Sequence, residues 1–237
     1  MSVNHNNYSR PKLNRYGAKR IFEIIIGLAV QIMIFFMAAG RLDLLRVWYY
    51  FGLLFVYLLI SGFLIVIHYP EIANIHGKKN EGTKQWDKVI LALLFVVSFI
   101  MPLVAGLDIG RGWSSIGEWG LVIGGFIFVG AAAITQLAMV ENPHFERTVR
   151  IQKERRHKVI SSGPYSMVRH PGYVGIILLT LSAPLIMGSL LALLPGLLTV
   201  ALLIVRTALE DKLLCAELKG YAAYARKVSY KLLPGVW

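Results

Sequence analysis

The residues best suited to chemistry lie in a polar stretch, residues 142–175, which separates two long apolar blocks of the chain. Within it, residues 162–164 (Ser-Gly-Pro) and 170–172 (His-Pro-Gly) form two turn signatures, because Pro fixes φ and Gly permits a positive φ. A polar connection of this length is uncommon unless it is functional or disordered, and fixed turns argue against disorder. We therefore interpret the stretch as a built site.

A second polar segment follows the last apolar block. Its Arg206 and Glu210 are spaced i to i+4, which places both on one face of a helix. The two segments together offer a small set of polar groups able to orient a ligand in a mostly apolar pocket: His157, Tyr165, His170, Tyr173, Arg206 and Glu210. A plainer alternative is that Arg169 and His170 are interfacial residues beside a turn, and that Arg206 and Glu210 are an ordinary exposed pair.

Common catalytic signatures are missing from the sequence, which has no GxSxG, no HExxH, no P-loop and no GxGxxG after a strand. The single Cys215 leaves no CxxC pair and no disulfide framework within one chain. Two His and few nearby carboxylates disfavour a metal site, so we predict none.

Composition places these segments in a membrane protein. The 237 residues are 56% hydrophobic and only 16% charged, well below the roughly 25% charged share of soluble domains. The net charge of +12 is typical of nucleic-acid binding, but the charges occupy short segments between apolar blocks, and not one basic face. Membrane topology explains the basicity better, and we predict no nucleic-acid partner.

Apolar blocks long enough to cross a bilayer occupy residues 21–40, 47–68, 88–106 and 119–140. A fifth block, residues 173–205, is too long for one span and is interrupted by Pro and Gly, so we interpret it as a helical hairpin turning near Gly188. The predicted fold is an all-α integral membrane protein with about six transmembrane helices, the last two forming that hairpin. Small residues of the fourth span are expected to allow close helix packing: Gly124, Gly125, Gly130, Ala131, Ala132 and Ala133.

Basic residues gather in the leader, in the connection around residues 69–88, in the polar stretch and after residue 205. The opposite connections hold only Arg41, Arg46 and Arg111. The positive-inside rule then predicts that both termini and both polar segments face the cytoplasm. No cleavable signal peptide is expected, because the first apolar run follows a long polar leader. Without an internal repeat, the sequence gives little support to a transporter.

An amphipathic helix is predicted to open near Arg206 and to end before Gly220. Tyr221, Tyr224 and Tyr230 follow it and are expected to close over a neighbouring pocket. The last residues, 231–237, are expected to be extended or turn-like.

The segment SSGPYSMVRHPGYVG (residues 161–175), the downstream Arg206, Glu210 and Asp211, and the ending KLLPGVW resemble the isoprenylcysteine carboxyl methyltransferase family and the related phospholipid N-methyltransferases. These are integral membrane enzymes that use S-adenosyl-L-methionine. The resemblance covers roughly residues 142–237. Residues 1–140, with the predicted transmembrane helices 1–4, match only as generic membrane helices. The resemblance implies a catalytic region in residues 141–237, with the cytosolic loop and C-terminal helix forming the cofactor site.

The resemblance also implies roles for single residues. The catalytic residues would be Arg206, Glu210 and His170, with Glu210 meeting the cationic end of the cofactor and Arg206 facing an acidic group of the substrate. The cofactor-binding residues would be Gln152, His157, Lys158, Val159, Ile160, Tyr165, His170, Pro171, Gly172, Tyr173 and Glu210. The chain departs from eukaryotic members in a shorter spacing between Gln152 and His157, and in Asp211, where a second Glu is common.

Carboxyl O-methylation of a lipophilic or membrane-associated acceptor is the leading reaction that the resemblance implies. A carboxylate acceptor needs no general base, whereas an amine or hydroxyl would need one, such as His170 or Glu210. Methylation of a phospholipid amine or a small thiol is the next alternative. An NADPH-dependent sterol-type reductase is a competing class, and a non-catalytic scaffold or transporter is a third. The predicted partners are the bilayer and a lipid-linked substrate.

Overall fold

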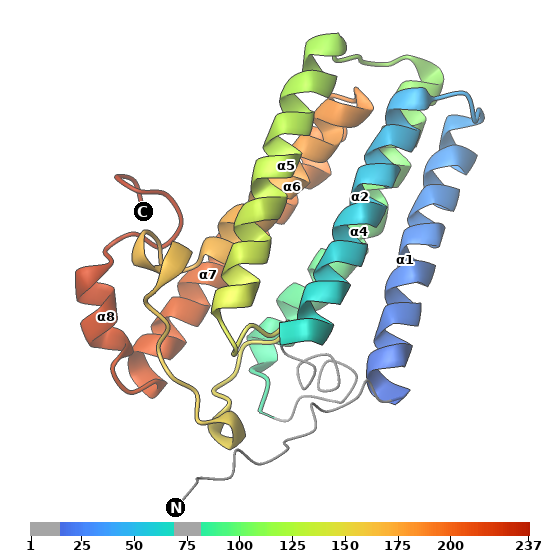
Figure 1. Cartoon of the computed structure of the whole chain (residues 1–237). Helices are drawn as coiled ribbons and strands as arrows, with labels where there is room; N and C mark the ends of the chain where they lie inside the picture. The colour runs from blue at the N-terminus through green and yellow to red at the C-terminus, as the bar shows by residue number, and fades with distance from the viewer. Residues whose placement is uncertain (1–14, 69–81) are drawn as a thin grey trace, which may run out of the picture.

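The computed structural model of the chain describes residues 15–68 and 82–237, which form helices, turns and loops. Seven α-helices are present in this part of the chain: α1 (Arg15–Ala39), α2 (Leu45–His68), α4 (Gln85–Arg111), α5 (Glu118–Glu141), α6 (Pro171–Met187), α7 (Leu193–Glu217) and α8 (Tyr221–Lys227) (Figure 1). Two short 3-10 helices, η1 (Lys153–Arg155) and η2 (Gly163–Ser166), lie in the connection between α5 and α6. The basic leader residues Arg10 and Lys12 and the connection 69–81 lie outside the described residues.

The predicted apolar blocks are helices in the structure. Five helices, α1, α2, α4, α5 and α7, are long and apolar enough to cross a membrane, while α6 is a shorter apolar helix of 17 residues. The predicted turn near Gly188 is present, since Gly188 ends α6 with a φ of 92° and α7 begins five residues later. Where about six spans were predicted, the described residues thus contain five long candidate spans and one short apolar helix.

One predicted boundary was wrong. The second arm of the 173–205 block does not stop before a separate cytosolic helix, because α7 continues without a break to Glu217. The amphipathic helix expected to begin near Arg206 is therefore the last part of α7, and its side chains are fixed relative to the membrane segment. The chain turns at Gly220, with a φ of 89°, into the short α8.

The tightest helix pair is α5 with α6, which lie side by side in Figure 1. At Gly175 of α6 an added Cβ would lie 2.0 Å from the Thr135 hydroxyl oxygen of α5, so only glycine permits this approach. Gly124 of α5 has the same role against Leu185 and Ile186 of α6. The expected packing role was wrong for Gly130, beside which an added Cβ would meet open space.

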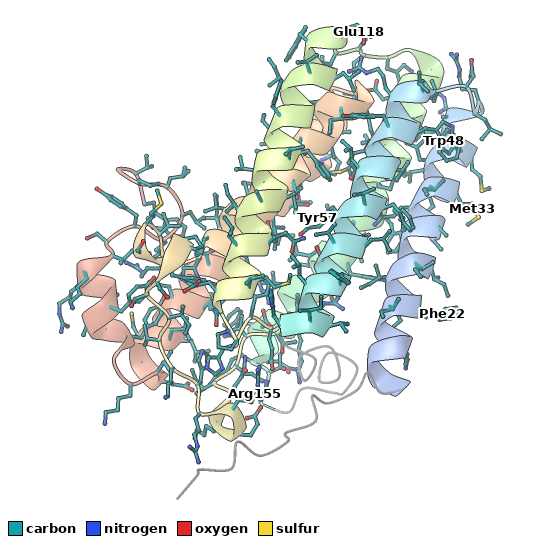
Figure 2. The ribbon with its side chains drawn as sticks, in the orientation of Figure 1. Phe22, Met33, Trp48, Tyr57, Glu118 and Arg155 are labelled. Atoms are coloured by element: carbon teal, nitrogen blue, oxygen red, sulfur yellow. The ribbon has the colours of Figure 1, made fainter. Side chains whose placement is uncertain are left out.

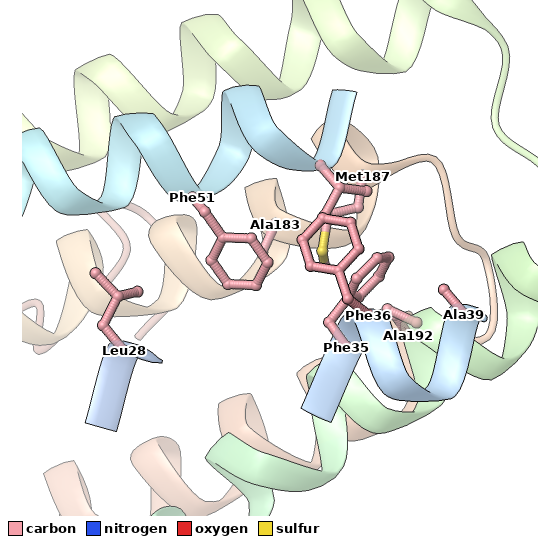
Figure 3. Close-up of a cluster of buried hydrophobic side chains, with 10 residues drawn as sticks. Leu28, Phe35, Phe36, Ala39, Phe51, Ala183, Met187 and Ala192 are labelled. Atoms are coloured by element: carbon pink, nitrogen blue, oxygen red, sulfur yellow. The ribbon is translucent and has the colours of Figure 1, made fainter. Parts of the chain in front are cut away.

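Buried side chains hold together the end of the bundle at which α1 and α6 finish. Phe35 and Phe36 of α1 and Phe51 of α2 pack against Ala183 and Met187 of α6 (Figure 3). These contacts bring α6 into the centre of the bundle. They also fix the direction in which its first turn, at Pro171, points towards the polar segments.

Two polar side chains close this end of the bundle. The Arg46 guanidinium donates hydrogen bonds to the carbonyl oxygens of Ile116 (2.8 Å), Leu185 (3.0 Å) and Ile186 (3.1 Å). It thereby satisfies carbonyls at the end of α6 that have no partner within the helix. Asp108 of α4, also buried, accepts hydrogen bonds from the hydroxyls of Ser114 and Ser189.

The polar segments meet at the opposite end of the bundle. Here α2 and α5 end, α4 begins, and the charged last part of α7 emerges beside α8 and the C-terminal segment (Figure 1). The connections from α1 to α2, from α4 to α5 and from α6 to α7 all lie at the other end. Both segments singled out in the sequence therefore share one end of the molecule.

Candidate functional site

A cavity of about 290 Å³ opens where these elements meet. This is close to the lower limit of the range, roughly 300 to 1,000 Å³, found for small-molecule sites. Its walls come from the ends of α2 and α5, the connection 142–160, the start of α6 and the last part of α7. Figure 2 marks Arg155 in η1, at the tip of that connection, beyond the ends of the long helices.

A buried ion-pair network forms one side of the cavity. The Arg169 guanidinium donates to both carboxylate oxygens of Asp211, at 2.8 and 2.9 Å. His170 Nε2 lies 3.1 Å from the same carboxylate, and the Tyr221 hydroxyl donates to it at 3.0 Å. Buried charges need such pairing because leaving either ion without a partner is costly. Asp211 thus holds α6, α7 and α8 together at one point.

Arg169 also holds the C-terminal segment in place. Its side chain donates to the carbonyl oxygens of Val228 (2.7 Å) and Ser229 (2.9 Å), and its backbone N–H donates to Tyr230 (2.9 Å). The backbone N–H of His170 donates to the Lys231 carbonyl oxygen at 3.0 Å. The segment after α8 is therefore fastened to the turn that begins α6.

Aromatic residues continue this wall. The Tyr224 hydroxyl donates to the Tyr165 carbonyl oxygen at 2.6 Å, and the Tyr165 hydroxyl donates to the Ala138 carbonyl oxygen at 3.2 Å. Burial raises the pKa of Tyr224 to about 12 and the pKa of Tyr165 further. Both phenols therefore stay neutral donors at physiological pH.

Glu210 and Arg206 of α7 line the cavity together with Tyr173. The Tyr173 hydroxyl donates to Glu210 at 2.5 Å, and the Arg206 guanidinium lies over the Tyr173 ring, 5.4 Å from its centroid. The plainer alternative, an exposed ion pair between Arg206 and Glu210, was wrong. Arg206 instead donates through Nε to the buried Asp87 carboxylate of α4 at 2.8 Å.

Two neighbouring imidazoles, tilted by 32° to each other, organise the connection after α5. The rings of His144 and His157 are 4.4 Å apart, centroid to centroid, and Gln152 lies between their segments. Gln152 donates through its side chain to the His144 carbonyl oxygen at 2.8 Å, while His144 Nε2 accepts from the Lys158 backbone N–H at 3.2 Å. Burial lowers the pKa of His157 to about 4, with nearby His144 and Arg155 adding to the effect, and burial also lowers the pKa of His144. Both rings are neutral at pH 7.

The structure brings the expected site residues together around this one cavity. Those lining it are Gln152, His157, Lys158, Val159, Ile160, Tyr165, His170, Gly172, Tyr173, Arg206 and Glu210. Pro171 is the exception, since it is buried as the first residue of α6 and does not line the cavity. Gly172 is required there because an added Cβ would lie 2.6 Å from the Phe145 ring. Tyr221 and Tyr224 line the wall as expected, but Tyr230 is exposed.

Several residues of the site were missed in the sequence. His144, Phe145 and Arg169 lie within the polar stretch, yet nothing in their spacing distinguishes them from solvated loop residues. Asp87 of α4 does not line the cavity and contributes through its contacts to Arg206 and to the Val149 backbone N–H. An ionisable residue next to a predicted span was the one available signal.

Comparison with known proteins agrees with the position of this site. Residues 122–216, which include α6 and most of α7, match the model of the Isoprenylcysteine carboxyl methyltransferase (ICMT) family. Through this region the chain is similar to that family. Two relatives, each described as a "Probable protein-S-isoprenylcysteine O-methyltransferase", come from Oryza sativa subsp. indica and subsp. japonica, and each is 25% identical over 126 residues. The alignment covers 51% of this chain and 64% of the relative, so the chain spans somewhat less than two thirds of the curated ICMT-family relatives that it matches.

Proposed function

We propose that the chain is a membrane methyltransferase that uses S-adenosyl-L-methionine and acts on a lipophilic or lipid-linked acceptor at the cytoplasmic face. The observation that carries the proposal is the convergence of the residues implied by the ICMT resemblance on one cavity at the end of the helical bundle. Similarity to the ICMT family supports the reaction class. The basic segments of this end support a cytoplasmic orientation, with six membrane-crossing helices including the short α6.

The chemistry of the cavity fits the cofactor. Glu210 supplies a carboxylate for a cationic amino or sulfonium group, and its orientation is fixed by the Tyr173 hydroxyl. Val159 and Ile160 line the cavity in an extended segment, and their backbone groups make no hydrogen bond within the described part of the chain. These groups are therefore available to the edge of a heterocycle. Tyr165, Tyr221 and Tyr224 supply the flat apolar surface that such a ring requires.

S-adenosyl-L-methionine, when bound, supplies an activated methyl group on a sulfonium. The protein's contribution is then to align donor and acceptor and to exclude water, because alignment supplies much of the acceleration of a displacement. Gly172 and the fixed α6 turn hold the wall beside Glu210, and the Arg169–Asp211 pair holds α8 over it. Arg206 would orient an acidic group of the acceptor from the membrane side.

Carboxyl O-methylation is the reaction that these residues favour. His170 Nε2 lies against the Asp211 carboxylate, and Glu210 is assigned to the cationic end of the cofactor, so neither candidate base is reserved for deprotonating an acceptor. A carboxylate acceptor avoids the need for either. A phospholipid amine or a small thiol remains the alternative acceptor, and would require one of these contacts to open.

The test is calorimetric binding of S-adenosyl-L-methionine and, separately, NADPH to the detergent-purified protein. We expect micromolar binding of S-adenosyl-L-methionine that is lost in Glu210→Ala and retained in Glu118→Ala, a matched glutamate at the opposite end of the bundle. Binding of NADPH alone would refute the proposal in favour of a reductase. Binding of neither ligand would refute it in favour of a scaffold or transporter.

A further inference from the structure

The N-terminal half of the chain contributes one charged group to the site. Asp87 lies in the first turn of α4, outside residues 122–216, and its side chain has 0% exposure. One carboxylate oxygen accepts from Arg206 Nε at 2.8 Å, and the other accepts from the Val149 backbone N–H at 2.8 Å. Both oxygens are therefore used in connecting α4 to α7 and to the connection that follows α5.

These contacts determine the orientation of the Arg206 guanidinium. Nε is held by Asp87, Nη2 donates to the Arg147 carbonyl oxygen at 2.5 Å, and one face of the group rests on the Tyr173 ring. Nη1 is the terminal nitrogen that these contacts leave for a ligand. The Arg206 side chain is only 7% exposed, so without Asp87 its charge would be buried and uncompensated.

Asp87 also affects Glu210. Arg206 and Glu210 are spaced i to i+4, the separation at which an Arg and a Glu on a helix pair with each other. In the structure they do not pair. Arg206 instead forms an ion pair with Asp87 of α4, and the Glu210 carboxylate accepts a hydrogen bond from the Tyr173 hydroxyl. The Glu210 carboxylate is therefore left without an ion pair to Arg206 and remains available to a cationic ligand in the cavity.

We propose that Asp87 is a positioning residue, which holds Arg206 away from Glu210 and so keeps the Glu210 carboxylate available to the cationic end of the cofactor. This inference rests on the proposed function for the identity of that ligand. It makes α4, which lies outside residues 122–216, part of the functional site.

The experiment compares four proteins: the wild type, Asp87→Asn, Arg206→Gln and the double variant carrying both substitutions. In Asp87→Asn one amide oxygen cannot accept from both Arg206 and Val149, and Arg206 becomes an uncompensated cation beside Glu210. We expect the Kd for S-adenosyl-L-methionine, measured by calorimetry, to rise about 10- to 100-fold. This is the effect of repulsion between one such positive charge and a cationic ligand in a partly dry cavity.

The double variant separates positioning from a merely structural role. It removes the uncompensated cation, so we expect cofactor affinity to return to within about threefold of wild type, although the Asp87 contact to Val149 remains lost. Lys84→Gln is the matched control, because it removes an exposed α4–α7 bridge to Glu217 without touching Arg206. An Asp87→Asn protein with wild-type affinity, or a double variant as weak as Asp87→Asn, would overturn the proposal.

A second readout does not depend on the ligand. The unfolding temperatures of the same four proteins form a double-mutant cycle. We expect the sum of the losses in the two single variants to exceed the loss in the double variant. Additive losses would overturn the Asp87–Arg206 coupling. Failure of the wild type to bind S-adenosyl-L-methionine would refute the proposed function, and this cycle would still decide whether Asp87 acts through Arg206.

Discussion

Replacing Asp211 by Asn should markedly lower the unfolding temperature of the protein. The substitution keeps the side-chain volume and removes one negative charge, so its effect is electrostatic and not a packing change. The Arg169 and Asp211 side chains are only 7% and 8% exposed. Removing one partner of a buried pair costs roughly 3 to 5 kcal/mol, because the other charge is left without compensation.

The lower part of this range applies here. Arg169 keeps its hydrogen bonds to the carbonyl oxygens of Val228 and Ser229, which still offset part of its charge. A loss of about 3 kcal/mol corresponds to roughly 6 to 12 °C for a chain of this size, taking about 2 to 4 °C per kcal/mol. We therefore expect the unfolding temperature, followed by intrinsic tryptophan fluorescence in detergent, to fall by about that amount.

The chain provides a control of the same chemistry. Arg41 and Asp43 form the same two-bonded fork, with both distances 2.7 Å, but their side chains are 53% and 70% exposed. Exposed pairs contribute roughly 0 to 1 kcal/mol, so Asp43→Asn should lower the unfolding temperature by less than about 4 °C. If Asp211→Asn and Asp43→Asn unfold within about 2 °C of each other, the reasoning from burial is refuted.

Three further predictions concern the connection after α5, the α5–α6 contact and the opposite end of the bundle. The folded pKa of His157, about 4, lies below its unfolded value near 6.5, so the unfolded chain binds more protons between these two pH values. The unfolding temperature should therefore fall from pH 7 towards pH 4, and His157→Asn should make it less dependent on pH. Gly175→Leu should abolish recovery of folded protein from detergent extracts, whereas Gly130→Leu, which meets open space, should leave size-exclusion profiles unchanged. Arg46→Gln should cost at least about 2 kcal/mol in chemical unfolding, since it leaves carbonyls at the end of α6 without a donor, and an unchanged midpoint would contradict this role.

The apolar helices could be predicted because their signal is local. Each is a continuous run of apolar residues, and the turns at Gly188 and Gly220 carry the positive φ that glycine permits. Much of the cavity wall was also local, since nine lining residues fall between positions 157 and 173, and Arg206 and Glu210 share one helix. The contacts that fix these groups were not local. Asp211 reaches Arg169 across 42 positions and Asp87 reaches Arg206 across 119, and no periodicity in the sequence records such pairs.

The missed aspartates show why hydropathy alone draws the wrong boundaries. The predicted third span, residues 88–106, stopped just short of Asp87 at one end and Asp108 at the other, because the apolar run alone set its limits. The helix in fact runs from Gln85 to Arg111 and buries both carboxylates completely. Each is stabilised by donors from distant segments, Arg206 for Asp87 and Ser189 for Asp108. Tertiary hydrogen bonds from Arg206 and Val149 offset the cost of burying Asp87, and the Ser114 and Ser189 hydroxyls offset it at one oxygen of Asp108. In this chain the acidic residue at each edge of the apolar block therefore belongs to the helix and makes a buried contact.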